Sequence, residues 1–109
     1  MMPIKPKNKK LYQKALNKWG MEFQLLMLME ECSELITATS KVFRYNNLEV
    51  IDRLAEEIAD VEIMIEQIKN AIGLQEACKL HKEKKLCRLS ELLEERDEVC
   101  LEKVKEEEI

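Results

Sequence analysis

NNLEVIDRLAEEIADVEIMIEQIKNAIG, residues 46–73, gives the clearest indication of how this chain folds. Its apolar side chains recur every three or four positions, the period of an α-helix with one buried face. They are Ile51, Leu54, Ala55, Ile58, Val61, Ile65, Ile68 and Ile72. Asn46 followed by Glu49 resembles a capping box, and Gly73 is a common helix terminator. The pattern predicts a helix from about Asn46 to Ile72.

The same period continues on both sides of this stretch. We expect a first helix from about Lys9 to Trp19 that stops near Gly20, a second over 21–45 and a fourth from Leu74 to about Glu95. The apolar stripe of the second helix is Leu25, Leu28, Met29, Cys32, Leu35, Ile36, Thr39, Val42 and Phe43. With only two Gly and two Pro among 109 residues, the sequence predicts an all-α fold.

The chain is long enough for one compact core. Residues 1–8, with Pro3 and Pro6, are expected to be a flexible N-terminal segment, residues 9–95 a helical domain and residues 96–109 a charged helical tail. The expected architecture is a four-helix-type bundle. Its apolar stripes are broad for a lone bundle of this size, so self-association that covers them is expected.

Composition and charge limit the kinds of partner and the cellular location that we expect for this protein. The net charge is −4, and the basic residues are scattered among acidic ones, which argues against nucleic acid. The longest purely apolar run, Leu25 to Met29, is too short to cross a membrane, and no export signal follows the basic N-terminus. The four cysteines show no C-x-x-C pairing, so reduced thiols and a cytoplasmic location are expected.

Two acidic pairs stand inside the apolar helices, where carboxylates are costly. Glu31 with Glu34, and Glu57 with Asp60, are three positions apart and share a helical face, where like charges repel. Each pair lies to the same side of its own stripe. If the two helices pack antiparallel, four carboxylates converge at the edge of the core, and a hard cation such as Mg²⁺, or Mn²⁺ as a substitute, would offset their repulsion.

Two other metal sites fit the sequence poorly. A di-iron bundle site needs Glu-x-x-His motifs, and the single histidine, His81, does not follow any of these glutamates at that spacing. Cys78, His81 and Cys87 lack a fourth ligand and the usual spacing of a zinc site.

The order of these motifs resembles a known family. Glu30-Glu31-x-x-Glu34 followed by Glu57-x-x-Asp60 is similar to the EExxE…ExxD signature of the all-α nucleoside triphosphate pyrophosphohydrolases, the MazG-like superfamily. The similarity covers roughly Trp19 to Leu89. It implies an enzyme that cleaves a nucleoside or deoxynucleoside triphosphate between its α- and β-phosphates, with a house-cleaning role in the nucleotide pool. It also implies a homodimer or homotetramer.

The resemblance assigns roles to the acidic residues. Glu31, Glu34, Glu57 and Asp60 match metal-ligand positions, and Glu31 is also placed with Glu30 in the catalytic group. Glu30 stands at the leading glutamate position, as a ligand, a group supporting a ligand or a base that orients water. Glu56 has no matching role and is expected to pair on the surface with Arg53.

A protein that binds a nucleoside triphosphate also needs positively charged side chains for the phosphates and a surface on which the base can stack. Lys41 and Arg44 follow the first acidic pair, and Lys85 and Arg88 resemble a K-x-x-R element of the family's last helix; all four are candidates for phosphate contact, with a solvated surface as the alternative. Trp19 is a candidate for base stacking, with core packing as the alternative, and Gln24 is a candidate hydrogen-bonding partner.

A second hypothesis comes from another class of function. The small size and the absence of an evident catalytic histidine also fit a non-catalytic helical module that binds a protein or a nucleotide. A plain coiled coil fits less well, because the apolar runs are too broad and interrupted for strict heptads.

Overall fold

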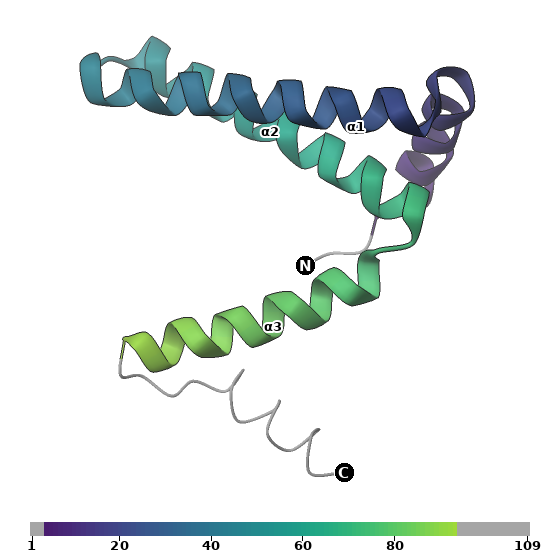
Figure 1. The fold of residues 1–109 in the computed structure, drawn as a ribbon. Coiled ribbons are helices and arrows are strands. Elements are labelled where there is room, and N and C mark those ends of the chain that lie inside the picture. The colour runs from purple at the N-terminus through teal and green to yellow at the C-terminus, as the bar shows by residue number, and fades with distance from the viewer. Residues whose placement is uncertain (1–3, 94–109) are drawn as a thin grey trace. The chain divides into compact units, whose positions relative to one another are not determined.

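The computed structural model describes residues 4–93, and this part of the chain is helical apart from short connections. The helices are α1 (Pro6–Arg44), α2 (Leu48–Ile72) and α3 (Gln75–Leu92) (Figure 1). No described residue lies in a strand, so the prediction of an all-α fold is confirmed. The expected tail over 96–109, and the predicted end of the last helix at Glu95, lie outside the described residues.

α1 consists of two helical segments separated at Gly20. Gly20 has φ 83° and ψ 165°, a conformation that residues with a β-carbon rarely adopt, so the predicted break is found there. The helix begins at Pro6, earlier than the predicted Lys9. Proline suits the first turn of a helix because its φ is already near the helical value and its missing N–H has no partner to lose.

α2 begins after Asn47, one residue later than the predicted cap at Asn46. The Asn47 side chain accepts a hydrogen bond from the backbone N–H of Val50 at 2.9 Å. This bond satisfies one of the amide groups left open at the start of the helix. At the other end, Gly73 adopts the left-handed conformation (φ 70°, ψ 44°) typical of a helix C-cap, as predicted.

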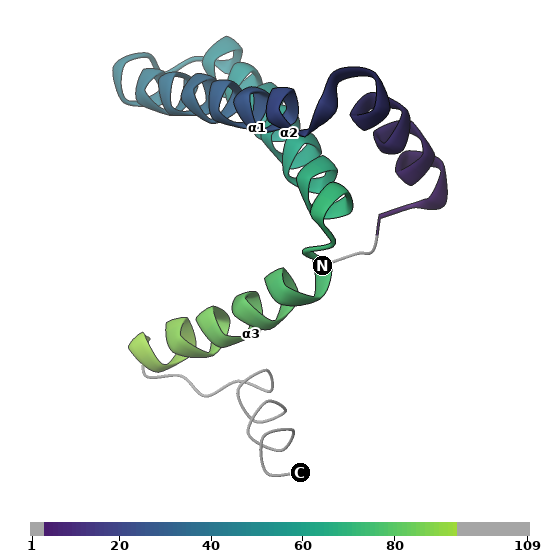
Figure 2. The same cartoon turned by 45° about the vertical axis from the view of Figure 1, so that its right-hand side comes forward.

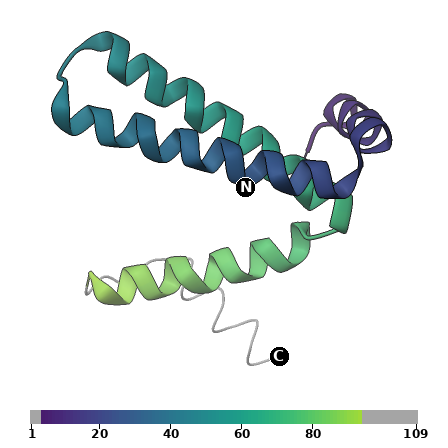
Figure 3. The ribbon, with the colours of Figure 1, turned by 45° about the horizontal axis from the view of Figure 1, so that its top comes forward.

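The second segment of α1 and α2 pack side by side and run in opposite directions, joined by the short turn after Arg44 (Figures 1 and 3). Ala38 from α1 and Val61, Met64 and Ile68 from α2 are buried. Only part of each predicted stripe is covered. The large apolar members left exposed on the two helices are Leu25, Met29, Ile36, Phe43, Ile51, Ile58, Ile65 and Ile72.

The first segment of α1 turns away at Gly20 (Figure 2), and the side chain of Tyr12 on this segment contacts the C-terminal half of α2. The buried Tyr12 donates a hydrogen bond from its hydroxyl to Oε2 of Glu66. Burial, followed by the interactions with Glu66, raises the pKa of Tyr12 to about 12. This bond joins the segment of α1 that precedes Gly20 to α2.

α3 belongs to a second compact unit, which begins at Leu74. Its sequence is strongly polar, and Lys85 and Arg88 lie exposed one turn apart on it. Cys32 on α1 and Cys78 on α3 are free thiols, as expected, whereas Cys87 is disulfide-bonded, so the expectation of reduced thiols is wrong at Cys87. None of the described helices combines the length and apolar character needed to cross a membrane.

Candidate functional site

The two acidic pairs meet where α1 packs on α2. Glu31 and Glu34 come from α1, Glu57 and Asp60 come from α2, and one carboxylate oxygen from each lies within 4.8 Å of the others. Because antiparallel helices bring matching faces together, two pairs that are separate in the sequence become one cluster. The convergence predicted from the spacing is therefore observed.

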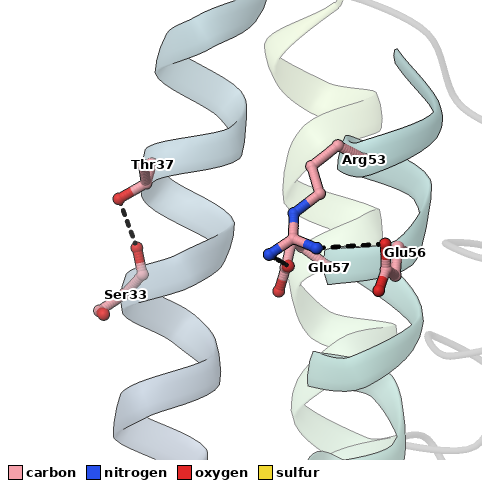
Figure 4. A network of polar contacts seen from close by, with 5 residues as sticks. All are labelled: Ser33, Thr37, Arg53, Glu56 and Glu57. Carbon is pink, nitrogen blue, oxygen red and sulfur yellow. Dashed lines mark hydrogen bonds and ion pairs between the residues drawn. The ribbon is translucent and has the colours of Figure 1, made fainter. Parts of the chain in front are cut away.

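Glu57 is the most enclosed member of this carboxylate cluster, with 1% of its surface exposed. Its Oε1 atom lies 2.8 Å from Nη2 of Arg53, one turn earlier on α2 (Figure 4). Its Oε2 atom and Oε2 of Glu31 are buried and accept no hydrogen bond from the part of the chain that the structure describes. A buried oxygen without a donor is unfavourable, because it has lost its water without a replacement.

The cluster also changes the acidity of two of its members, Glu31 and Glu57. Burial raises the pKa of Glu31, and repulsion from Glu34, Asp60, Glu57 and Glu30 raises it further. Burial is likewise the largest cause that raises the pKa of Glu57; the Arg53 guanidinium opposes this effect, and the charges of Glu34 and Asp60 add to it. For these two groups the charged form is therefore disfavoured when nothing positive other than Arg53 is near.

The donor set fits a hard divalent cation. Every member supplies a carboxylate oxygen, and two buried oxygens have open lone pairs. Mg²⁺ and Mn²⁺ prefer oxygen ligands, and their charge would offset the repulsion that raises the two pKa values. The set contains no imidazole or thiolate, which zinc and iron sites usually include.

Glu30 and Glu56, the other two acidic residues of the motifs, are both exposed. Glu30 adjoins Glu31 in the chain but is not a member of the cluster. Oε2 of Glu56 lies 3.3 Å from Nη1 of Arg53, so the predicted surface pair is found.

Arg53 has a larger role than the sequence indicated. Its guanidinium joins Glu56 to Glu57, and its side chain is 54% exposed. The side chain also borders a surface hollow together with Ala38, Lys41, Glu49 and Val50. The spacing of Arg53 and Glu57, one helical turn, was the available signal for this contact. The contact is important because Glu57 is buried, and this burial cannot be read from the sequence.

The other predicted substrate residues are distributed over the chain. Lys41 borders the same hollow, whereas Arg44 donates a hydrogen bond to the Ser40 hydroxyl at 3.2 Å. Lys85 and Arg88 are on α3, in the second unit, and their contact with phosphate stays a prediction.

Trp19 and Gln24 lie on either side of the Gly20 break. Trp19 is 52% exposed. The centroid of its ring lies 5.8 Å from that of Phe23 and 5.4 Å from the Lys18 ammonium. Exposure at this level disfavours the alternative of core packing for Trp19. Gln24 is 3% exposed, and its buried Oε1 atom has no hydrogen-bond partner.

Comparison of the chain with protein-family models, curated protein sequences and solved structures gave no match.

Proposed function

We propose that this protein is a Mg²⁺-dependent nucleoside triphosphate pyrophosphohydrolase, which converts a nucleoside or deoxynucleoside triphosphate to the monophosphate and pyrophosphate. The observation that carries the proposal is the convergence of Glu31, Glu34, Glu57 and Asp60 within 4.8 Å. The buried, unpartnered oxygens of Glu31 and Glu57 provide independent support, because they are acceptors that lack a positive partner. The EExxE…ExxD order of the motifs agrees with this function.

The four carboxylates would hold the cation. A bound divalent cation would neutralise charge on the triphosphate oxygens and lower the pKa of a coordinated water. The protein contributes the fixed geometry, because the ligands project from two packed helices and Arg53 holds one oxygen of Glu57 in place. Glu30 is exposed beside the cluster, and we propose that it accepts the proton of the attacking water.

We also propose that the protein acts in the cytoplasm as a homodimer or homotetramer, with its helices completing a bundle of the four-helix type. The supporting observation is the number of large apolar side chains that α1 and α2 leave exposed, among them Met29 at 62%, Ile36 at 70% and Phe43 at 89%. Met29, Ile36 and Phe43 are seven positions apart and therefore share one face of α1. An exposed apolar face of this kind is typical of an interface. Chromatography coupled to light scattering would measure the assembly directly.

A product assay tests the activity. Purified protein is incubated with a panel of nucleoside and deoxynucleoside triphosphates plus Mg²⁺ or Mn²⁺, and products are separated by ion-exchange chromatography. We expect monophosphate and pyrophosphate in equal amounts, and no reaction in EDTA. Diphosphate with inorganic phosphate would show cleavage at another bond. The absence of any product from the whole panel would contradict the proposal and favour a non-catalytic binding module.

A further inference from the structure

A surface hollow lies next to the carboxylate cluster, and its position indicates how the substrate lies. It is bordered by Lys41 from α1 and by Arg53 from α2, with Ala38, Glu49 and Val50 completing its wall. Ala38 lies one turn after Glu34, and Arg53 lies one turn before Glu57. The hollow therefore adjoins the carboxylate cluster on the side of the turn that joins α1 to α2.

The chemistry of the hollow favours an anion. Arg53 uses one N–H for Glu57 and one for Glu56, and a guanidinium has five, so donors remain on a side chain that is 54% exposed. The exposed Lys41 makes no ion pair within the described residues. α2 begins at Leu48, which places the positive end of its helix dipole beside Val50. Among the residues that the structure describes, Glu49 is the one anionic side chain that borders the hollow.

From this arrangement, and resting on the proposed function, we infer that Arg53 and Lys41 form the subsite for the β- and γ-phosphates, the part of the substrate that leaves as pyrophosphate. Arg53 joins the two halves of the site, because the same guanidinium holds Glu57 and faces the hollow. A guanidinium suits this task since its planar donors match the spacing of phosphate oxygens.

The inference also fixes the direction of the nucleotide along α1. Lys41 lies after the acidic pair Glu31 and Glu34 in the chain, roughly 10 Å beyond Glu34 at 1.5 Å per helical residue. The exposed rings of Trp19 and Phe23 lie before that pair, next to the Gly20 break. With its terminal phosphates in the hollow, the substrate would extend its base toward these rings.

Binding of inorganic pyrophosphate tests the subsite without requiring turnover. Calorimetric titrations are made at saturating Mg²⁺ on the full chain and on its Arg53→Gln, Lys41→Gln and Glu49→Gln variants. We expect about a 10-fold or greater loss of pyrophosphate affinity for each of the first two changes, since each removes a charged donor. Glu49→Gln should bind pyrophosphate more tightly, because it removes an opposing charge. Lys14→Gln, on the first segment of α1, is the matched control and should bind as the unchanged chain does.

A merely structural role for Arg53 predicts a different pattern. If Arg53 only holds Glu57, Arg53→Gln should weaken Mn²⁺ binding, and saturating metal should restore pyrophosphate affinity. Lys41→Gln should then have no effect on either ligand. That pattern, or unchanged pyrophosphate binding in both variants, would overturn the subsite even if the protein hydrolyses nucleotides. Loss of binding in both variants would support it even if the panel of triphosphates gave no product.

Discussion

Nη2 of Arg53 lies 2.8 Å from Oε1 of Glu57, while Oε2 of the same carboxylate is buried without a hydrogen-bond partner. One oxygen is therefore held by a neighbour on the same helix, and the other is left for a ligand. Glu57 also belongs to the carboxylate cluster, in which its ligand oxygen lies within 4.8 Å of those of Glu31, Glu34 and Asp60. We therefore expect Glu57, more than any other residue of the cluster, to lower the stability of the metal-free protein while being required for function.

Glu57→Gln should separate these two effects. Without metal, the variant should melt at the same temperature as the unchanged chain or higher, because the raised pKa of Glu57 means that its charged form is disfavoured in the folded state. With metal, it should lose most of the Mg²⁺-induced rise in melting temperature that linkage predicts for the unchanged chain. Nucleotide turnover should fall by more than the roughly 10- to 100-fold typical for residues that only support a metal ligand.

Glu62→Gln is the matched control, because Glu62 is also a glutamate of α2 but is exposed and lies outside the carboxylate cluster. It should melt and turn over as the unchanged chain does. Normal turnover by Glu57→Gln would show that the ligand assignment is wrong.

Stability in EDTA should depend on pH through Glu31 and Glu57. Both carboxyls have pKa values above the ordinary 4.5, so between 4.5 and the raised values the folded chain keeps protons that the unfolded chain has lost. Their contribution to stability is present below pH 4.5 and is lost as the pH rises through the raised pKa values. Urea unfolding over a pH series, compared with the Glu31→Gln/Glu57→Gln double variant, measures this contribution.

In that comparison, the stability of the unchanged chain relative to the double variant should fall with rising pH in EDTA. Saturating Mg²⁺ should reduce or reverse the fall, because the cation binds the deprotonated carboxylates. Parallel pH profiles of the two proteins in EDTA would contradict the raised pKa values.

Gly20→Ala should destabilise the protein by about 1–3 kcal/mol through backbone strain. Gly20 has φ 83° and ψ 165°, and no atom lies within 4 Å of the position of an added β-carbon, so crowding contributes nothing. Gly73→Asn is the matched control, because Asn tolerates the left-handed conformation of a C-cap with little cost. Urea unfolding measures both, and equal losses in the two variants would contradict a special role for the Gly20 conformation.

Tyr12→Phe should cost about 1.5–3 kcal/mol, the usual contribution of a hydrogen bond to a charged group. Since the pKa of Tyr12 is raised from 10.0 to about 12, the stabilisation should be complete below pH 10 and disappear as the pH rises toward 12. Ultraviolet absorbance of tyrosinate follows the titration, and Tyr45→Phe, which removes a tyrosine that is 54% exposed, is the control. A single ordinary titration for both tyrosines would contradict the Tyr12–Glu66 contact.

Features that depend on neighbours along the chain could be predicted from the amino-acid sequence alone. The helical period, the breaks at Gly20 and Gly73 and the placement of Glu31 with Glu34, and of Glu57 with Asp60, follow from local geometry, which repeats every few residues. Small errors occurred where two local signals were close in strength, as at the cap, which is Asn47 instead of Asn46.

How the helical faces meet follows from the three-dimensional packing and could not be predicted from the sequence. The burial of Glu57 to 1%, the contact of Tyr12 with Glu66 and the hollow shared by Lys41 and Arg53 join residues that are distant in the sequence or depend on what covers them. A periodic pattern marks an apolar stripe but not which edge of it is covered, because that depends on the register and angle at which two helices pack. For the same reason, the sequence gives no sign that Arg53 matters. Its contact with Glu57 is important because helix packing has removed that carboxylate from water.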